Sequence, residues 1–369
     1  MSATGVQDAG FPVGSTPGGV APAAPLRVVF LCGERSPWGL AHLPALLNDR
    51  RFQIVRIVLA SDARWASFRR AVGGERDPGL RRPRVAGCAI KSLMRRAFAA
   101  LKPRQRTMTD AFFLRLGEPH APVTVCDDVH DPAILALLQR DEADVLFCAA
   151  YPQILKPALL SLYPGRAFNS HPSLLPRCRG AHPVFWAIAS GERSSGGTIH
   201  YLTDEIDAGD IVAQVEAPMA DDVSYRDLYG RLKAAVPALI DGLARFLSTP
   251  GSKGRPQDNA RATFFRNDRL IHHRIFWSMM TAVEIDRLVR ACNGEAFFYV
   301  DGVRARLIKV RVAAGNRNVT NHWRVPPGAI VDFEGEQAVV AAQSGFVRLE
   351  RMVAPRRAWR PLQIGQVLS

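Results

Sequence analysis

The sequence predicts an α/β protein with a Rossmann-like, mostly parallel sheet and a small β-rich second domain. Up to about residue 247, short apolar runs that indicate buried strands alternate with helical segments. After a Pro- and Gly-rich stretch, the pattern changes to closely spaced strands. The length of 369 residues suits two domains, and the 47% hydrophobic content is enough for a large core.

Strand, helix and strand open the first domain, and this order indicates parallel pairing. The apolar runs are residues 26–32 and 53–60, and between them Ser36 and Pro37 predict the cap and first turn of a helix. Further helices are predicted at 133–140, 155–162, 183–190 and 225–247, and further strands at 144–150, 167–171, 198–202 and 211–216. Pro237 predicts a kink in the last helix.

A change of composition separates the two domains. Pro, Gly, Ser and Lys are frequent after residue 247, which predicts a linker at 248–264. Beyond it, Thr281 and Glu284 predict a capping box, and Asp301-Gly302 predicts a two-residue hairpin. The predicted organisation is a disordered tail at 1–25, a catalytic domain at 26–247, the linker, and an OB-like β-rich domain at 265–369.

Charge and cysteine content limit the classes of function. The net charge is +14, and the segment from Arg69 to Arg106 has twelve Lys or Arg residues against two acids. This segment is either a patch for phosphates of RNA or of a nucleotide-linked substrate, or an Arg-rich surface exposed to solvent. Six scattered cysteines without a CxxC pair predict neither a metal site nor disulfides. The chain has no secretory signal pattern and no apolar run of membrane-spanning length, so the cytoplasm is the expected location.

Asn169 and His171 stand two residues apart at the end of a predicted strand. On an extended chain they point to the same face, and Pro172 favours that extended geometry. In an open α/β sheet, ligands bind at such strand ends. An amide and an imidazole can donate hydrogen bonds to an oxygen that gains negative charge, and histidine can move a proton near neutral pH. The pattern therefore suits acyl-type transfer.

Asp207 is the candidate carboxylate that would orient or charge this histidine. It lies in the segment DEIDAGD, where the neighbouring glycine and strand predict a loop that can fold back. A lone Asn-x-His pair also occurs by chance, and a structural role for His171 is equally compatible with the residues. From the residues alone, the reaction of this α/β enzyme stays open.

Two longer segments resemble the signatures of one enzyme family, the 10-formyltetrahydrofolate-dependent formyltransferases. Residues 169–180 (NSHPSLLPRCRG) resemble the first signature, and residues 198–214 (TIHYLTDEIDAGDIVAQ) resemble the second. Both stand in the family's order and at its separation, and the likeness covers roughly residues 26–245. The second domain is similar to the C-terminal domain of some members, although Phe276 stands there in place of a usual acidic residue. In the first signature, Cys178 stands where an aromatic residue is usual.

The resemblance implies catalytic residues and a formyl donor. Asn169 and a protonated His171 would hold the developing oxyanion, and Asp207 would support the charged histidine. The formyl donor implied is 10-formyltetrahydrofolate. The residues implied in its binding are Tyr151, Pro152, Gln153, Ile154 and Leu155, together with Leu202 and Asp204.

The acceptor amine is less well defined by the resemblance. The run HPVFWAI at residues 182–188 resembles that of enzymes that formylate nucleotide-linked amino sugars, which predicts a small-molecule amine. Methionyl-tRNA formyltransferase is the alternative, because the positive charge and the second domain fit a tRNA partner. A formyltetrahydrofolate hydrolase and a non-catalytic RNA- or ligand-binding relative are further alternatives. The oligomeric state stays open.

Overall fold

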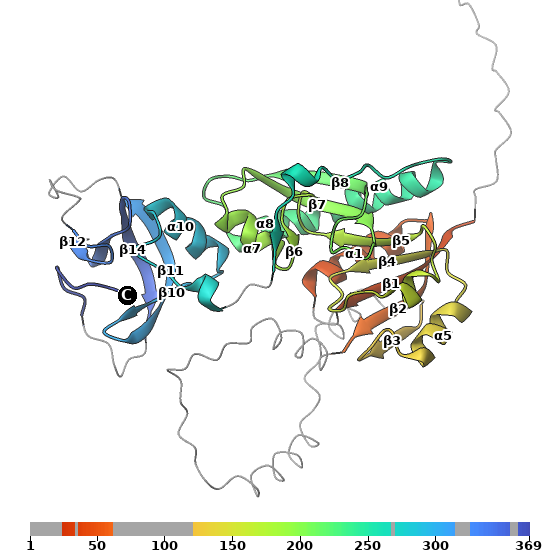
Figure 1. Ribbon diagram of the computed structural model, residues 1–369, viewed down its shortest axis with the longest axis horizontal. Helices are drawn as coiled ribbons and strands as arrows, with labels where there is room; N and C mark the ends of the chain where they lie inside the picture. Colours follow the sequence, from red (N-terminus) through yellow and green to blue (C-terminus); the bar gives the residue numbers. More distant parts are fainter. Residues whose placement is uncertain (1–23, 34–35, 62–120, 267–269, 314–324, 355–360) are drawn as a thin grey trace, which may run out of the picture.

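The computed structural model describes residues 24–33, 36–61, 121–266, 270–313, 325–354 and 361–369, and Figure 1 shows them as two units. The first unit is built on a seven-stranded sheet and the second on a five-stranded sheet. The segment from Arg69 to Arg106 and nearly all of the predicted N-terminal tail lie outside the described residues. None of the helices within the described ranges combines the length and the apolar character that a membrane span requires.

The first sheet is mostly parallel, as predicted. Its strands are β1 Leu26–Gly33, β2 Phe52–Ala60, β3 Val123–Cys126, β4 Val145–Ala149, β5 Ala167–His171, β7 Ser194–Tyr201 and β8 Ile211–Pro218. They lie in the order β3-β2-β1-β4-β5-β7-β8, with parallel pairs from β3 to β5 and antiparallel pairs at β7 and β8. The sequence analysis missed the edge strand β3, because it is four residues long and half exposed.

Four helices of the first unit begin at a proline, including the helix at Pro37, which the sequence analysis used as a start signal. The helices of the first unit are α1 Pro37–Asn48, α5 Pro132–Arg140, α6 Pro157–Leu160, α7 Pro183–Ala189, α8 Tyr225–Ala234 and α9 Val236–Ser248. The single helix predicted over residues 225–247 is wrong, since α8 and α9 are separated at Ala235. Pro237 is the second residue of α9, where its missing amide hydrogen would have no partner within the helix, so it lies at the start of a new helix instead of in the middle of one.

The two faces of the first sheet bury separate clusters of side chains. Phe30 packs on one face with residues of α1 and α9, and its neighbour Leu31 packs on the other with residues of α5 and α6. Successive strand residues point to opposite faces, so a fully buried strand reads as an unbroken apolar run. Burial of each such side chain is worth about 1.5–3 kcal/mol, which makes the sheet a firm base for residues at its strand ends.

The second unit is an antiparallel sheet with one helix. Its elements are α10 Ala282–Ala291, β10 Phe297–Val300, β11 Val303–Ala313, β12 Ile330–Glu334, β13 Gln337–Ala341 and β14 Phe346–Val353, with strand order β10-β11-β14-β13-β12. The predicted capping box is present, because the side chains and backbone amides of Thr281 and Glu284 bond reciprocally. Asp301 and Gly302 have φ values of 48° and 78°, as the predicted two-residue hairpin requires.

The predicted linker is more than a connection between the units. Residues 248–264 include the 3₁₀ helix η1 Asn259–Arg261 and the first residue of β9 Phe264–Phe265. Strand β9 pairs with β6 Arg179–Gly180, and Arg255 bonds through its backbone to Ile211 of β8. Composition reports a high content of turn formers but not what their backbone groups bond to, so these bonds were not predicted. The domain boundaries, including those of the linker, stay a prediction.

Candidate active site

The site is built at the end of β5, where the strand pairs with β7. The register places Asn169 opposite His200 and His171 opposite Thr198. His171 and His200 are only 6% and 1% exposed, whereas Asn169 is partly open. Because residues opposite one another on antiparallel strands share a face of the sheet, Asn169 and His200 lie side by side.

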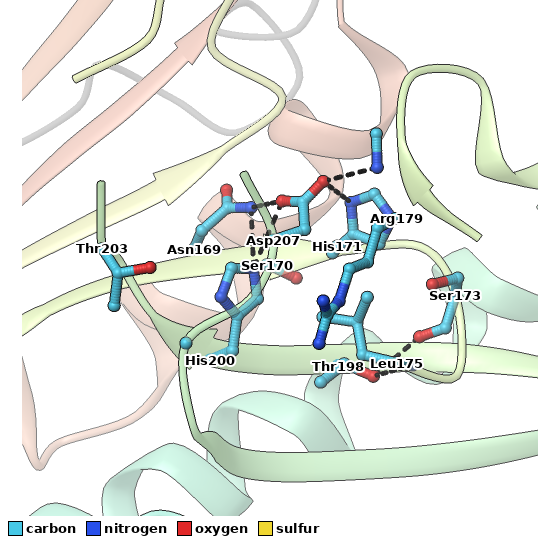
Figure 2. A network of polar contacts seen from close by, with 12 residues as sticks. Asn169, Ser170, His171, Ser173, Leu175, Arg179, Thr198, His200, Thr203 and Asp207 are labelled. Atoms are coloured by element: carbon cyan, nitrogen blue, oxygen red, sulfur yellow. Dashed lines mark hydrogen bonds and ion pairs between the residues drawn. The ribbon is translucent and has the colours of Figure 1, made fainter. Parts of the chain in front are cut away.

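Asp207 folds back onto these residues, as the sequence predicted. Figure 2 shows its carboxylate between the two imidazoles: Oδ2 lies 3.5 Å from Nδ1 of His171, and Oδ1 lies 3.5 Å from Nε2 of His200. The side-chain amide of Asn169 approaches Oδ1 at 3.4 Å, and the backbone amide of Gly180 donates to Oδ2 at 2.8 Å. Residues that stand far apart in the sequence thus surround a single carboxylate.

The loop that carries Asp207 has an unusual backbone. Asp207 itself has a φ of 52°, in the left-handed region that residues with a side chain seldom adopt. Two residues later, a Cβ atom at Gly209 would lie 2.0 Å from the carbonyl oxygen of Tyr201. Only glycine allows this close approach to β7, so Gly209 sets how the loop returns to the sheet.

The surroundings of Asp207 favour its charged form. Burial by itself raises the pKa of this carboxyl, but the charge of His171, the bond to and charge of His200 and the amide of Gly180 hold the pKa well below its usual range. A carboxylate that is ionised and buried needs partners with N–H groups. The two imidazoles and the Gly180 amide fill that need.

His171 uses both of its ring nitrogens within the protein. Nε2 lies 2.9 Å from the carbonyl oxygen of Cys178, and a carbonyl only accepts, so Nε2 carries a hydrogen. Nδ1 faces the Asp207 carboxylate at 3.5 Å. This approach is favourable when Nδ1 is protonated too, so the arrangement suits an imidazolium next to a carboxylate.

His200 is the imidazole that faces the cleft next to the site. Its Nδ1 donates to the carbonyl of Tyr201 at 2.8 Å, and its Nε2 lies 3.2 Å from the amide nitrogen of Asn169. Asn169, His200 and Asp207 line the cleft, whereas His171 lies behind them. The sequence analysis did not include His200 among the site residues. In the sequence, His200 shows only that it lies on a predicted strand, seven residues before Asp207. The pairing of β5 with β7, which places His200 opposite Asn169, is what identifies it as a site residue.

A buried network holds β5 from behind. Ser170, between the two motif residues, accepts a bond from the Trp38 indole at its carbonyl, 2.9 Å away. Its hydroxyl lies 2.8 Å from Nε2 of His42, and Nδ1 of His42 donates to the Trp38 carbonyl at 2.8 Å. Burial lowers the pKa of His42 to about 4, against a smaller raising effect of the Trp38 carbonyl. His42 is therefore neutral and accepts from Ser170, which fixes the strand that presents Asn169 and His171.

The cleft beside Asn169, His200 and Asp207 has a volume of about 810 Å³. The seven residues that the resemblance implied for folate binding all line it: Tyr151, Pro152, Gln153, Ile154, Leu155, Leu202 and Asp204. Ile154 is 69% exposed and gives the cleft wall an apolar surface. The side-chain amide of Gln153 accepts a hydrogen bond from the Val129 amide and donates one to the Asp128 carboxylate. The structure brings these residues together, and their contact with a ligand stays a prediction.

The opposite wall comes from β6 and from the end of the predicted linker. Gly180, Ala181, Phe264, Phe265 and Arg266 line this side. Trp186 of α7 stacks on Phe265 at 4.4 Å between ring centroids, and it does not line the cleft. The tryptophan of the run HPVFWAI therefore supports a cleft wall from behind.

Comparisons with known proteins agree with this arrangement. A model described as "Formyl transferase" matches residues 117–241, and one described as "Formyl transferase, C-terminal domain" matches residues 271–360. The methionyl-tRNA formyltransferase of Roseiflexus sp. (strain RS-1) is 32% identical over 336 residues, which cover 88% of this chain and 87% of that protein. The methionyl-tRNA formyltransferase of Stutzerimonas stutzeri (strain A1501) is 32% identical over 252 residues, or 67% of this chain and 76% of that protein.

A solved structure supports the fold. The N-formyltransferase from Helicobacter canadensis, crystallised with folinic acid and dTDP-3-aminofucose, superposes with a TM-score of 0.54. The likeness covers 87% of this chain and 98% of that one, at 17% sequence identity. At this identity the match shows the fold, and it confirms the predicted combination of a mostly parallel sheet with a β-rich second unit.

Proposed function

This chain belongs to the formyl transferase family, whose enzymes use 10-formyltetrahydrofolate, and we propose that it transfers the formyl group to a primary amine. The observation that carries the proposal is the cluster of Asn169, His171 and Asp207 at the end of β5. The cluster adjoins a cleft of about 810 Å³, and strand ends of open α/β sheets are where such proteins bind ligands. We propose these three residues as the catalytic group.

The cleft fits the formyl donor in size and character. Its volume lies within the roughly 300–1,000 Å³ of small-molecule sites. The apolar side chains of Ile154, Leu155 and Leu202 suit the faces of a flat heterocycle. Residues 151–155 and 203–206 line the cleft, and we propose that their backbone groups bond to its edge. When bound, 10-formyltetrahydrofolate supplies a formyl group on its N10 atom.

The residues at the cleft floor are suited to hold negative charge on an oxygen. We propose that the Asn169 amide donates to such an oxygen, because it lines the cleft at the end of β5. The Asp207 carboxylate is a weak base, since its pKa is held low, so we assign it an electrostatic role. It keeps a protonated His171 favourable, and His171 brings positive charge behind the cleft floor. For His171 to donate directly to a ligand, it must release either Cys178 or Asp207.

The acceptor that we propose is a nucleotide-linked amino sugar. The support is the run at residues 182–188, whose resemblance to that of sugar-modifying enzymes led to the prediction. These residues form α7, directly after the β6 wall of the cleft. An acceptor that reaches Asn169 from this side passes Gly180, Ala181 and Phe264.

Methionyl-tRNA is the second candidate, and a specific observation favours it. The Roseiflexus methionyl-tRNA formyltransferase is similar to this chain over 87% of its own length, including the second unit. The net charge of +14 also suits a polyanionic partner. The two acceptors call for the same chemistry at Asn169, His171 and Asp207, so only the acceptor itself distinguishes them.

The test is release of tetrahydrofolate from 10-formyltetrahydrofolate in the presence of dTDP-linked amino sugars, methionyl initiator tRNA, or no acceptor. Turnover that requires an amino sugar supports the first candidate, and turnover that requires the charged tRNA supports the second. Release without acceptor indicates a hydrolase. A His171→Ala variant separates catalysis from binding: loss of turnover with retained folate binding supports an enzyme. If the wild type binds folate but is inactive in every reaction, the proposal of formyl transfer to these amines is wrong.

A further inference from the structure

Residues 255–265, which we call the crossing segment, run over both loops that carry the polar partners of His171. At one end, Arg255 exchanges backbone hydrogen bonds of 2.8 Å with Ile211, just after the Asp207 loop. At the other end, Thr263 accepts from the amide of Cys178 at 2.8 Å through its hydroxyl oxygen. The carbonyl of Cys178 is the partner of His171 Nε2. One stretch of chain thus touches both sides of the proposed catalytic group.

Gln257 lies in the middle of the crossing segment and bonds directly to the Asp207 loop. Its side-chain nitrogen donates to the carbonyl of Asp207 at 2.9 Å and to the carbonyl of Gly209 at 2.7 Å. These two carbonyls flank the residue that follows Asp207, so the amide holds the turn from both sides. Within the loop, the Ala208 amide lies 3.5 Å from the Glu205 carbonyl, a longer approach than either bond from Gln257.

Arg179 holds the other end of the Gln257 amide. Nε and Nη2 of Arg179 donate to Oε1 of Gln257 at 3.0 and 2.8 Å, and Nη2 also donates to Asn259 at 2.9 Å. The orientation of the amide is therefore determined: carbonyls require its nitrogen on one side, and a guanidinium requires its oxygen on the other. Arg179 is 8% exposed, and no carboxylate among the described residues lies within ion-pair distance of it. The buried Arg179 guanidinium thus donates to the side-chain oxygens of Gln257 and Asn259.

The Asp207 loop needs such support from outside. The left-handed φ of 52° at Asp207 is less favourable for a residue with a side chain than an extended or helical φ, so bonds from outside the loop help to keep it. In this conformation the carboxylate reaches His171, His200 and the Gly180 amide. If the backbone relaxed, the carboxylate would move away from all of them.

We infer that Gln257, anchored by Arg179, is a positioning residue that holds the Asp207 carboxylate against His171. The inference rests on the proposed function for its effect on turnover, but its structural content concerns the carboxylate alone. Gln257 does not line the cleft, so it acts through Asp207 and not through contact with a ligand. The connection has few steps: the Arg179 guanidinium bonds to the Gln257 amide, and this amide bonds to the backbone of the loop that carries the Asp207 carboxylate.

The variant Gln257→Met tests this inference, because it keeps the length of the side chain and removes the amide without adding charge. We expect the pKa of Asp207, followed by ¹³C NMR of its carboxyl, to rise toward the ordinary aspartate value as its partners are lost. We expect kcat to fall about ten- to hundredfold while KM for the formyl donor changes less than about threefold. The resonance is assigned by its absence in Asp207→Asn.

Gln53→Met is the matched control, because Gln53 is exposed on β2, away from the site. It should leave the Asp207 titration and kcat as in the wild type. Arg179→Lys keeps the charge and loses the bond from Nε, and it should shift the titration in the same direction by a smaller amount. An Asp207 carboxyl that titrates as in the wild type in folded Gln257→Met or Arg179→Lys protein would overturn the inference. An inactive wild-type protein would overturn the proposed function. The titration of the Asp207 carboxyl would still test whether Gln257 positions it.

Discussion

Nδ1 of His171 lies 3.5 Å from Oδ2 of Asp207, and the other ring nitrogen of His171 donates to a backbone carbonyl. The pair is nearly buried, with side-chain exposures of 7% and 12%. Buried polar groups are stable only when hydrogen bonds satisfy them, and the amide of Gly180 and the carbonyl of Cys178 bond to the carboxylate and the imidazole here. The Asp207 carboxylate is therefore the negative charge that both imidazoles and the Gly180 amide face.

Replacing Asp207 with Asn should affect turnover far more than binding. The change removes the negative charge that favours a protonated His171, so we expect kcat to fall about 10²–10³-fold. The dissociation constant of the folate should change little, because the rest of the cleft is unaltered. Steady-state kinetics and folate titration measure the two quantities. The exposed residue Asp221 provides the control variant Asp221→Asn, and equal turnover of Asp207→Asn and wild type would remove Asp207 from the mechanism.

Gly209 and Gly230 should respond oppositely to alanine. A Cβ at Gly209 meets the Tyr201 carbonyl at 2.0 Å, so Gly209→Ala should lower the free energy of unfolding by about 1–3 kcal/mol and reduce turnover. Gly230 is exposed in α8 with open space around it, so Gly230→Ala should raise stability by about 0.5–1 kcal/mol. Urea unfolding measures both. A Gly209→Ala protein as stable and active as the wild type would show that the loop approaches β7 less closely than described.

His42 should make the protein sensitive to mild acid. Burial lowers the pKa of His42 from 6.5 to about 4. Between these pH values, His42 is therefore protonated in the unfolded chain and neutral in the folded protein. Stability contributed by neutral His42 is thus complete above pH 6.5 and is lost as the pH falls to 4, by about 3 kcal/mol in total. Unfolding by urea across this range should show a steeper loss for the wild type than for His42→Gln. Parallel curves would mean that His42 does not titrate as its burial requires.

The position of a truncation should matter strongly near the end of the first unit. A chain ending at Thr249 lacks Gln257, Thr263 and β9, whereas a chain ending at Arg266 keeps them. We expect the shorter protein to have a lower Tm and a raised Asp207 pKa, because the crossing segment is missing. Thermal unfolding and carboxyl NMR of the two truncated proteins test this expectation. If both behave alike, the crossing segment does not support the Asp207 loop, and residues 248–264 act only as the linker that the sequence analysis predicted.

Much of the fold was predictable because its signals are local. Buried strands such as β1 and β4 appear as apolar runs, and Ser36, Thr281 and Asp301-Gly302 mark turns and caps through their own hydrogen bonds and φ values. The bonding of residues 248–264 was not predicted from composition, because it depends on distant partners. The break at Ala235 has a local cause in Pro237, whose effect was predicted as a kink and not as a new helix start.

The site shows the same division. Asn169 and His171 share a face because of strand geometry, and the loop with Asp207 was expected to fold back. His200 joined the group only through the pairing of β5 with β7. Gln257 had no local signal at all, because its role consists of bonds to two carbonyls and one guanidinium elsewhere in the chain.

The antiparallel register of β5 and β7 restricts how this protein can evolve in length. Opposite Asn169 stands His200, and the next residue along β7 is Ile199, which is fully buried in the core. A net slip by one residue would exchange the two, placing an isoleucine at the cleft and an imidazole in the core. Insertions and deletions inside β5 or β7 would cause such a slip, whereas the connection at residues 172–193 can change in length while the pairing is kept. Divergence within the two strands should therefore proceed by substitution, with changes of length confined to the segment between them.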